Sequence, residues 1–149
     1  MSLALGTARS ADLPQLVELL GILFTQEAEL SPEPDRQRRA LELILADPSR
    51  ARIYVAREGG KVIAMAALHF TTSTAEGGRV AGLEDCVVHP KHRRKGVGEK
   101  LLGYVLGQAK AEGALRVMLL TDGDNLIAQG LYRKLGFQPS TMLPMRLRF

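Results

Sequence analysis

A basic, glycine-containing segment of this sequence could bind a phosphate group. It reads Arg93-Arg94-Lys95-Gly96-Val97-Gly98 and directly precedes an amphipathic helical pattern. The first N–H groups of a helix lack intrahelical partners, and the helix dipole adds about half a positive charge there, so phosphate binds readily. The segment is therefore a candidate phosphate site. A solvated basic loop with capping glycines is the alternative interpretation.

Two adjacent carboxylates, Glu84 and Asp85, could handle protons. They interrupt an otherwise apolar run from Leu83 to Val88, although acidic residues are depleted in strands. Alternation along a strand would send the two side chains to opposite faces. An alkylamine is protonated at neutral pH, with a reference pKa of about 10.4, so a positioned carboxylate could serve as its base. Pairing of one or both with nearby arginines is the alternative.

Two well-known phosphate motifs are absent from the sequence. A P-loop needs Gly-Lys followed by Ser or Thr, but Val62 follows Lys61 and Glu99 precedes Lys100. The dinucleotide fingerprint needs a third glycine at the position of Leu101. Nucleotide-hydrolysis and nicotinamide chemistry are therefore disfavoured.

The apolar spacing predicts which elements position these residues. Helices are expected after the N-cap Ser10 to residue 24, from 35 to 45, from 98 to 111 and from 125 to 135. Strands are expected over 3–7, 53–57, 62–72, 80–89 and 115–120, with one or two more within 137–149. The run 115–120 is almost wholly apolar, which is typical of a central strand buried on both faces.

Composition limits the class of protein. The 149 residues, 46% hydrophobic and 24% charged, suit a single globular domain over 1–149. The lone cysteine, Cys86, excludes an internal disulfide, and three scattered histidines lack zinc spacing, so no metal is expected. No stretch has the length and apolarity of a membrane span or a leader, which favours a cytoplasmic protein. The net charge of +4 favours an anionic partner.

Two blocks of the sequence resemble the GCN5-related N-acetyltransferase (GNAT) family. The first is Arg93-x-x-Gly96-x-Gly98, placed after a strand that ends at Val88-His89-Pro90. The second block, at the usual separation, comprises Asn125, Ala128, Leu131-Tyr132-Arg133-Lys134 and Gly136-Phe137. The resemblance implies an α/β (α+β) fold, in which a mixed, mostly antiparallel central sheet of six to seven strands is flanked by about four helices.

The resemblance also implies acetyl-CoA as cosubstrate. Backbone N–H groups from Arg94 to Gly98 would surround its pyrophosphate, and the main chain of Cys86 to Val88 would pair with the pantetheine arm. Asn125 would reach the pantetheine or only cap a helix. The residues expected at the cofactor are Cys86, Val87, Val88, Arg93, Arg94, Lys95, Gly96, Val97, Gly98, Glu99 and Asn125.

For catalysis the resemblance implies direct attack of the amine in a ternary complex. Glu84 is the first choice as base, through a water molecule, and Asp85 the second, because the local string resembles polyamine and, less closely, glucosamine-phosphate N-acetyltransferases. Tyr132 matches the family's general acid for the leaving thiolate. The amide of Val87 or Val88 would stabilise the oxyanion.

The acceptor and partners are less defined by the sequence. A small primary amine and a homodimer are expected; a protein or peptide acceptor and a non-catalytic acyl-CoA sensor are alternatives. The segments 25–39, 70–79 and 138–146 would form the acceptor wall. A nucleic-acid module that uses Lys91 to Lys95 is disfavoured, since no aromatic residue lies within that run.

Overall fold

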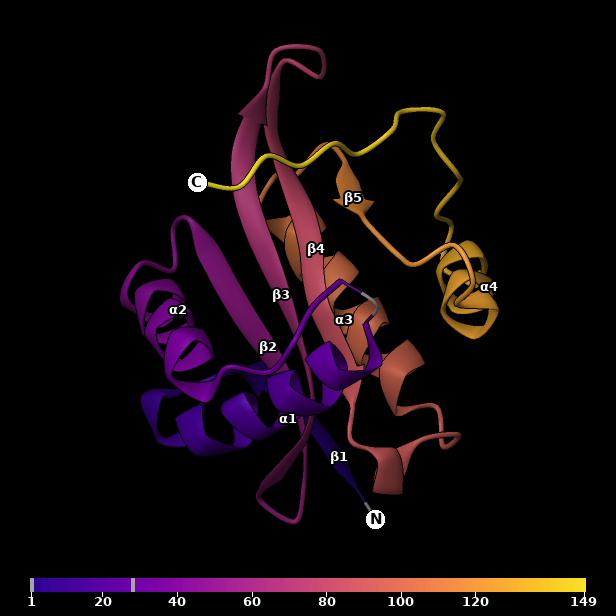
Figure 1. Cartoon of the computed structure of the whole chain (residues 1–149). Coiled ribbons are helices and arrows are strands. Elements are labelled where there is room, and N and C mark those ends of the chain that lie inside the picture. Colours follow the sequence, from indigo (N-terminus) through magenta and orange to yellow (C-terminus); the bar gives the residue numbers. More distant parts are fainter. Residues whose placement is uncertain (1, 28) are drawn as a thin grey trace.

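One five-stranded sheet organises the described residues, 2–27 and 29–149, of this computed structural model. Strands β1 (Leu3–Thr7), β2 (Ala51–Glu58), β3 (Lys61–Ser73) and β4 (Gly78–Val88) lie side by side and antiparallel. Strand β5 (Val117–Leu119) joins β4 in parallel (Figure 1). The sheet is thus mixed and mostly antiparallel, as the sequence predicts.

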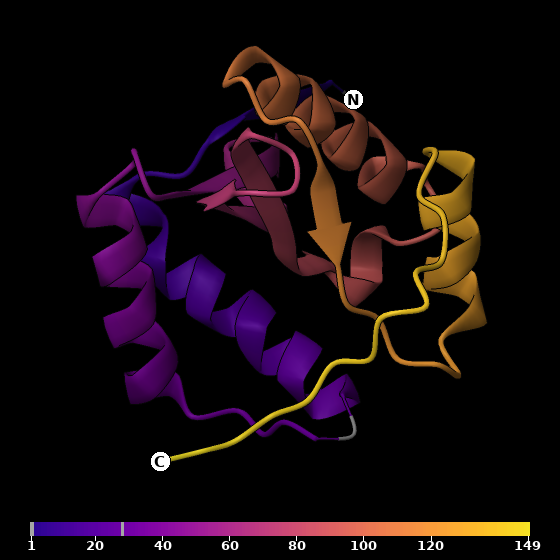
Figure 2. The same ribbon diagram turned by 90° about the horizontal axis from the view of Figure 1, so that it is seen from above.

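Four α-helices cover the two faces of this sheet in the described part of the chain, in agreement with the sequence. Helices α1 (Leu13–Gln26) and α2 (Pro34–Ala46) lie on one face. Helices α3 (Val97–Ala111) and α4 (Leu126–Lys134) lie on the other (Figure 2). Short 3-10 turns, Ser10–Asp12 and Pro90–His92, precede α1 and α3. None of the described helices is long and apolar enough to cross a membrane.

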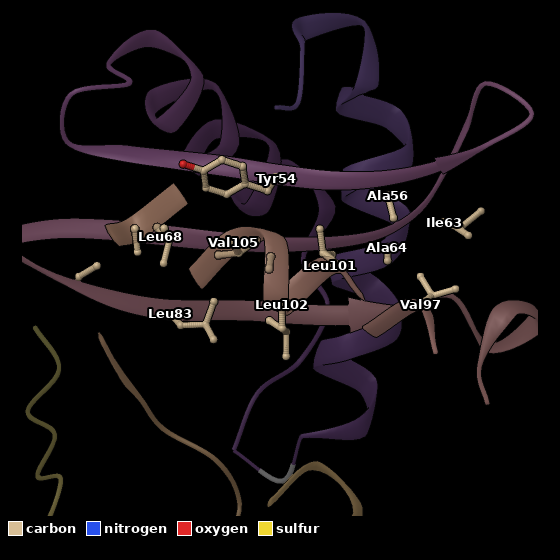
Figure 3. Close-up of a cluster of buried hydrophobic side chains, with 13 residues drawn as sticks. Tyr54, Ala56, Ile63, Ala64, Leu68, Leu83, Val97, Leu101, Leu102 and Val105 are labelled. Carbon is tan, nitrogen blue, oxygen red and sulfur yellow. The ribbon is translucent and has the colours of Figure 1, made fainter. Parts of the chain in front are cut away.

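Alternating side chains of the central strands supply both cores. On the α3 face, Tyr54 of β2 and Leu68 of β3 meet Leu101, Leu102 and Val105 of the helix (Figure 3). On the opposite face the intervening strand residues pack against α1 and α2. Burial of apolar surface on both sides, worth roughly 25 cal/mol per Å², makes β3 a rigid support for its neighbour β4.

The start of α1 differs from the sequence prediction. Ser10 makes no cap; the buried carboxylate of Asp12 accepts a hydrogen bond from the Arg9 N–H at 2.7 Å instead. It also accepts two hydrogen bonds from Arg57 of β2, at 2.7 and 2.6 Å. These hydrogen bonds from Arg57 are the main reason that the pKa of Asp12 is lowered. A buried carboxylate needs such a partner, and the pair fixes α1 on the sheet.

The C-terminal part of the sheet also differs from the prediction. Six to seven strands were expected, but residues 137–149 form no strand in the described chain. The predicted central strand at 115–120 is a three-residue edge strand, and Leu115, Met118 and Leu120 are exposed. An apolar run is buried on both faces only when other elements cover both faces. In the described chain β5 is the last strand of the sheet, so its outer edge is not covered by another strand.

Candidate active site

A β-bulge in β4 lies at the two carboxylates. Glu84 faces Ala67 of β3 and Val87 faces Met65, so Asp85 and Cys86 together oppose one residue. Asp85 adopts a left-handed conformation, with φ +55°. The extra residue breaks the strand alternation. The expectation that Glu84 and Asp85 point to opposite faces rests on regular alternation, which the bulge interrupts between these residues and Val87.

Beside the bulge, β4 and β5 separate. They pair only where Ala81 to Leu83 meets Val117 to Leu119. The N–H of His89 donates to Ile63 of β3 at 2.8 Å. Because successive N–H groups along a strand point to opposite edges, that of Val88 points to the side where β5 has diverged. The β4 main chain after Leu83 thus has an outer edge, here called the opening, to which no strand is paired among the described residues.

The predicted phosphate loop connects β4 to the N-terminus of α3. Arg94 and Gly96 have φ values of +63° and +77°, which turn the chain sharply into the helix. Across the described residues, the backbone N–H groups from Arg94 to Glu99 find no acceptor in the protein, and Lys100 makes the first helical bond, to Gly96. Several backbone donors without an acceptor therefore lie in succession at the helix N-terminus, where an anion binds readily.

The side chain of Arg93 holds this loop in place. Its Nε donates to the carbonyl oxygen of Val88 at 3.0 Å. The side-chain amide of Gln26 in α1, oriented to satisfy both groups, accepts from the two terminal nitrogens of Arg93 at 3.1 and 2.8 Å. The loop's remaining cations, Arg94 and Lys95, are exposed.

Two histidines add further ties between the loop and the body of the protein. His89 lies 3.5 Å from Glu18 of α1, and His92 lies 3.3 Å from Glu58 of β2. Both pairs join the short turn before the loop to elements that are fixed on the sheet. The loop is thus positioned from both α1 and β2.

Helix α4 closes the other side of the opening. Glu99 of α3 is paired with Lys134 at 2.7 Å, which links the two helices. A Cβ at Gly98 would stand 3.4 Å from Val88 and 3.7 Å from Leu131, so this glycine permits close packing of α3 with β4 and α4. The Asn125 side chain accepts from the N–H of Ala128 at 3.2 Å and caps α4.

Tyr132 lies on α4 close to the bulge. Its ring makes an edge contact with Phe137, with centroids 5.9 Å apart. Burial is the main reason that the pKa of its hydroxyl is raised, and nearby Cys86 and Glu27 raise it further. The hydroxyl therefore stays protonated at neutral pH and can donate a hydrogen bond.

The bulge gives its two carboxylates different surroundings. Burial, and then the charge of Glu84, raises the pKa of Asp85 to about 6, which His69 partly counteracts. Glu84 is exposed and lies 3.3 Å from His69 Nε2. Burial and Asp85 raise the pKa of Cys86 to about 12, so its thiol is not ionised and makes a poor nucleophile.

Sequence analysis missed two acidic residues near this group. Burial raises the pKa of Glu27, at the end of α1, and the charges of Asp122 and Asp85 raise it further. Glu27 falls within the expected acceptor-wall segment 25–39, but no motif or spacing marks it or Asp122. Only the fold brings α1, the bulge and the segment after β5 together.

The family model described as the acetyltransferase (GNAT) family matches residues 13–137. The chain belongs to the GNAT family. A glucosamine 6-phosphate N-acetyltransferase of Trypanosoma brucei brucei is 28% identical over 143 residues, covering 93% of this chain and 90% of that one. An uncharacterized N-acetyltransferase of Bacillus subtilis is 34% identical over 89 residues, or 60% of each chain.

Solved structures share the GNAT fold. A Trypanosoma brucei acetyltransferase has a TM-score of 0.76 at 26% identity, covering 99% of this chain and 100% of that one. Glucosamine-6-phosphate N-acetyltransferase from Arabidopsis thaliana has a TM-score of 0.78 at 22% identity, covering 99% of each chain. The sheet and the helices described above therefore have the GNAT fold.

The charge on Asp85 should cost this GNAT protein stability. Its folded pKa of about 6 lies above the ordinary aspartate value of 3.8, so the native state loses stability as pH rises through about 6. The variant Asp85→Asn tolerates the left-handed backbone and removes the charge. We expect it to be more stable than the wild type at pH 8 in urea unfolding, with the gain shrinking towards pH 4.

The control is Glu42→Gln, which changes an exposed carboxylate on α2 paired with Arg38 at 3.3 Å. Its stability relative to the wild type should change little at any of these pH values. A gain for Asp85→Asn that is equal at pH 8 and pH 4, or a loss at pH 8, would contradict the buried-charge account.

Proposed function

We propose that this chain is an acetyl-CoA-dependent N-acetyltransferase that acts on a cationic, small-molecule primary amine. One observation carries the proposal: the opening beside β4 runs from the free N–H groups at the start of α3 to the carboxylates at the bulge and Tyr132. A cosubstrate with phosphates at one end and a thioester at the other suits such a path. Family membership supports the same activity.

The cofactor would bind mainly through backbone groups. The N–H groups from Arg94 to Glu99 would donate to the pyrophosphate, and the exposed cations Arg94 and Lys95 would add charge-assisted contacts. The pantetheine arm would lie along Cys86 to Val88 in the place of a paired strand. Arg93 acts as a positioning residue because its side chain is engaged with Val88 and Gln26.

The bulge would supply the base. Both carboxylates stay candidates, but the pKa of about 6 favours Asp85 over Glu84, since a base works best with a pKa near the operating pH. The carboxylate takes a proton from the ammonium, directly or through water. The amine then attacks the thioester carbonyl carbon in the ternary complex.

The tetrahedral intermediate would be stabilised from β4 and α4. The N–H of Val88 points to the opening and suits the oxyanion better than that of Val87, which lies on the β3 side by alternation. When the carbon–sulfur bond breaks, the Tyr132 hydroxyl gives its proton to the leaving thiolate, and the second proton of the attacking nitrogen, released as the amide forms, returns to the Tyr132 oxygen through water. Asn125 serves the site by capping α4, which carries Tyr132.

The charge around the bulge favours a cationic acceptor. Glu27, Glu84, Asp85 and Asp122 supply carboxylates. Burial is the main reason that the pKa values of Glu27 and Asp85 are raised, and the charges of neighbouring carboxylates raise them further; an ammonium group would relieve that repulsion. The relative from Trypanosoma brucei brucei acts on a phosphorylated aminosugar by its name. Four arginines could receive such a phosphate or a carboxylate. Arg36, Arg38 and Arg146 are paired with carboxylates in this chain, whereas Arg39 is exposed and makes no ion pair among the described residues, so a phosphorylated acceptor stays an alternative.

The remaining expectations stay predictions. These are the single domain over 1–149, the cytoplasmic location and the homodimer. The alternative of a non-catalytic acyl-CoA sensor differs from the proposal in one respect, because it would bind acetyl-CoA without turnover.

Acetyl-CoA affinity should depend on the turn at Gly96. The φ of +77° costs an L-residue about 1–2 kcal/mol, so Gly96→Ala should shift the phosphate loop and weaken binding several-fold. The control is Gly107→Ala in α3, where nothing lies within 4 Å of a new Cβ. Isothermal titration of acetyl-CoA should show saturable binding to the wild type and the control. Absence of saturable binding to the wild type would defeat the proposed function.

Turnover should separate the roles of the carboxylates and Tyr132. With the best amine found by thiol release, Asp85→Asn should lower kcat by at least tenfold and remove the rise in activity near pH 6, while acetyl-CoA affinity stays close to wild type. Tyr132→Phe should lower kcat without changing that pH profile. If Glu84→Gln alone abolishes the pH dependence, Glu84 is the base; if no variant lowers kcat, the assignment is wrong.

A further inference from the structure

His69 of β3 lies against the carboxylates at the bulge and has no part in the steps described above. Its Nε2 lies 3.3 Å from Glu84 Oε2. Burial and the charge of Glu84 raise the pKa of Asp85, and His69 partly counteracts them. His69 therefore contacts one of the two candidate bases and acts electrostatically on the other.

The register of β3 and β4 explains how His69 reaches Glu84. Alternation puts His69 on the same face of β3 as Ala67, which packs in the core under α1 and α2. Glu84 lies opposite Ala67 and shares that face of the sheet (Figure 1). Gly82 lies directly opposite His69 and has no side chain, so the imidazole can lean along β4 to Glu84, two residues away.

The pair of His69 and Glu84 is loose compared with the structural pair of Asp12 and Arg57. Among the described residues, Nε2 of His69 is buried without a hydrogen-bond partner, so its contact with Glu84 is not aligned as a hydrogen bond. The two side chains are 40% and 60% exposed. The pair of Asp12 and Arg57 is buried and has two hydrogen bonds, at 2.7 and 2.6 Å. An exposed, poorly aligned ion pair adds little stability, so another cation can replace the imidazolium at little cost.

The ionisable groups that act on the bulge from neighbouring elements are also carboxylates. They are Glu27 at the end of α1 and Asp122 after β5. Glu18, the charged residue within α1, is paired with His89 instead. Strand β2 presents uncharged Ala51 opposite His69. The charge that the imidazole meets on this face is therefore negative.

We propose that His69 is a specificity-determining residue: it holds Glu84 as the carboxylate that receives the acceptor's ammonium group, competes with that group for it, and leaves Asp85 as the base. The inference rests on the proposed function. In the empty site the imidazolium neutralises Glu84. An arriving ammonium group takes its place, and the imidazolium gives its proton to water. A cationic acceptor should therefore bind more tightly when the imidazole is neutral.

Two substitutions fix the charge at this position in opposite states. His69→Gln removes the positive charge at every pH, and His69→Lys keeps it at every pH. Imidazole changes its charge between about pH 5 and 8, so the wild type should follow His69→Lys near pH 5.5 and His69→Gln near pH 8. At about pH 5.5, His69→Gln should have an acceptor KM several-fold below that of the wild type. At about pH 8, His69→Lys should have an acceptor KM several-fold above it, and KM for acetyl-CoA should stay unchanged in both.

A second signature is expected in kcat. Burial and Glu84 raise the pKa of Asp85 to about 6 against the opposing effect of His69. His69→Gln removes that opposition, so the rise of kcat near pH 6 should move to higher pH. A histidine with only a structural role would change stability or kcat in the same way at every pH.

The acceptor for these measurements is whichever of butylamine, diaminobutane and glucosamine 6-phosphate gives the fastest thiol release with the wild type. The control Lys110→Gln removes one positive charge from the last turn of α3, on the other face of the sheet, and should leave both pH profiles unchanged. If His69→Lys does not fold, the comparison of His69→Gln with the wild type near pH 5.5 decides.

An acceptor KM that is equal in the wild type and His69→Gln near pH 5.5 would overturn the inference and leave the proposed function intact. A lower KM for His69→Lys than for His69→Gln would also overturn it, because His69 would then meet an anionic group of the acceptor. Thiol release with none of the three amines would contradict the proposed function itself, and this inference with it.

Discussion

The register shift between β3 and β4 is the constraint on which the rest of the site depends. Because Asp85 and Cys86 together oppose one residue of β3, the main chain of β4 changes direction at Asp85, and both carboxylates lie at this bend. Immediately beyond, β4 is no longer paired with β5 and leads into the phosphate loop. The main-chain edge of β4 that the proposed pantetheine arm would use begins at this point. The two-sided packing of β3 supplies the rigidity that maintains the bulge.

The same arrangement has an electrostatic cost. Burial, and then the charge of Glu84, raises the pKa of Asp85; burial, and then the charges of Asp122 and Asp85, raises that of Glu27. Elsewhere in the fold the buried carboxylate of Asp12 is paired with the guanidinium of Arg57. Among the described residues the carboxylates at the bulge have His69, 3.3 Å from Glu84, but no arginine or lysine partner, and such a group suits a site that receives a cation.

Sequence reasoning located the parts of the site that depend on local chain geometry. The cationic turn, the glycine at φ +77° and the helix that follows are contiguous, so their pattern is legible in one segment. The cap at Asn125 is local for the same reason. Two glycine pairs, Gly59-Gly60 and Gly77-Gly78, lie at the turns that join β2, β3 and β4, so the antiparallel order of these three strands is also legible locally. The pairing of β1 with β2 is not, because two helices separate them in the sequence.

The features that sequence reasoning missed depend on distant residues. A bulge leaves no trace in the alternation of a short acidic string, so Glu84 and Asp85 were expected on opposite faces. Glu27 approaches Asp85 and Asp122 only after α1 has packed on the sheet. Asp12 replaces Ser10 at the start of α1 because Arg57, far along the chain, lies within hydrogen-bond distance. The apolar run 115–120 predicts a central strand, but its composition does not show whether a further strand pairs with its outer edge, and in the described chain none does.

Amide hydrogen exchange with and without acetyl-CoA tests the central claim most directly, because the account assigns cofactor binding to backbone groups. At saturating acetyl-CoA, protection should rise at Val88 and at the N–H groups from Arg94 to Glu99, which find no acceptor in the described protein. The N–H of His89, already bonded to Ile63, should change little. Saturable binding that leaves Val88 and residues 94–99 unprotected would contradict cofactor binding through these backbone groups.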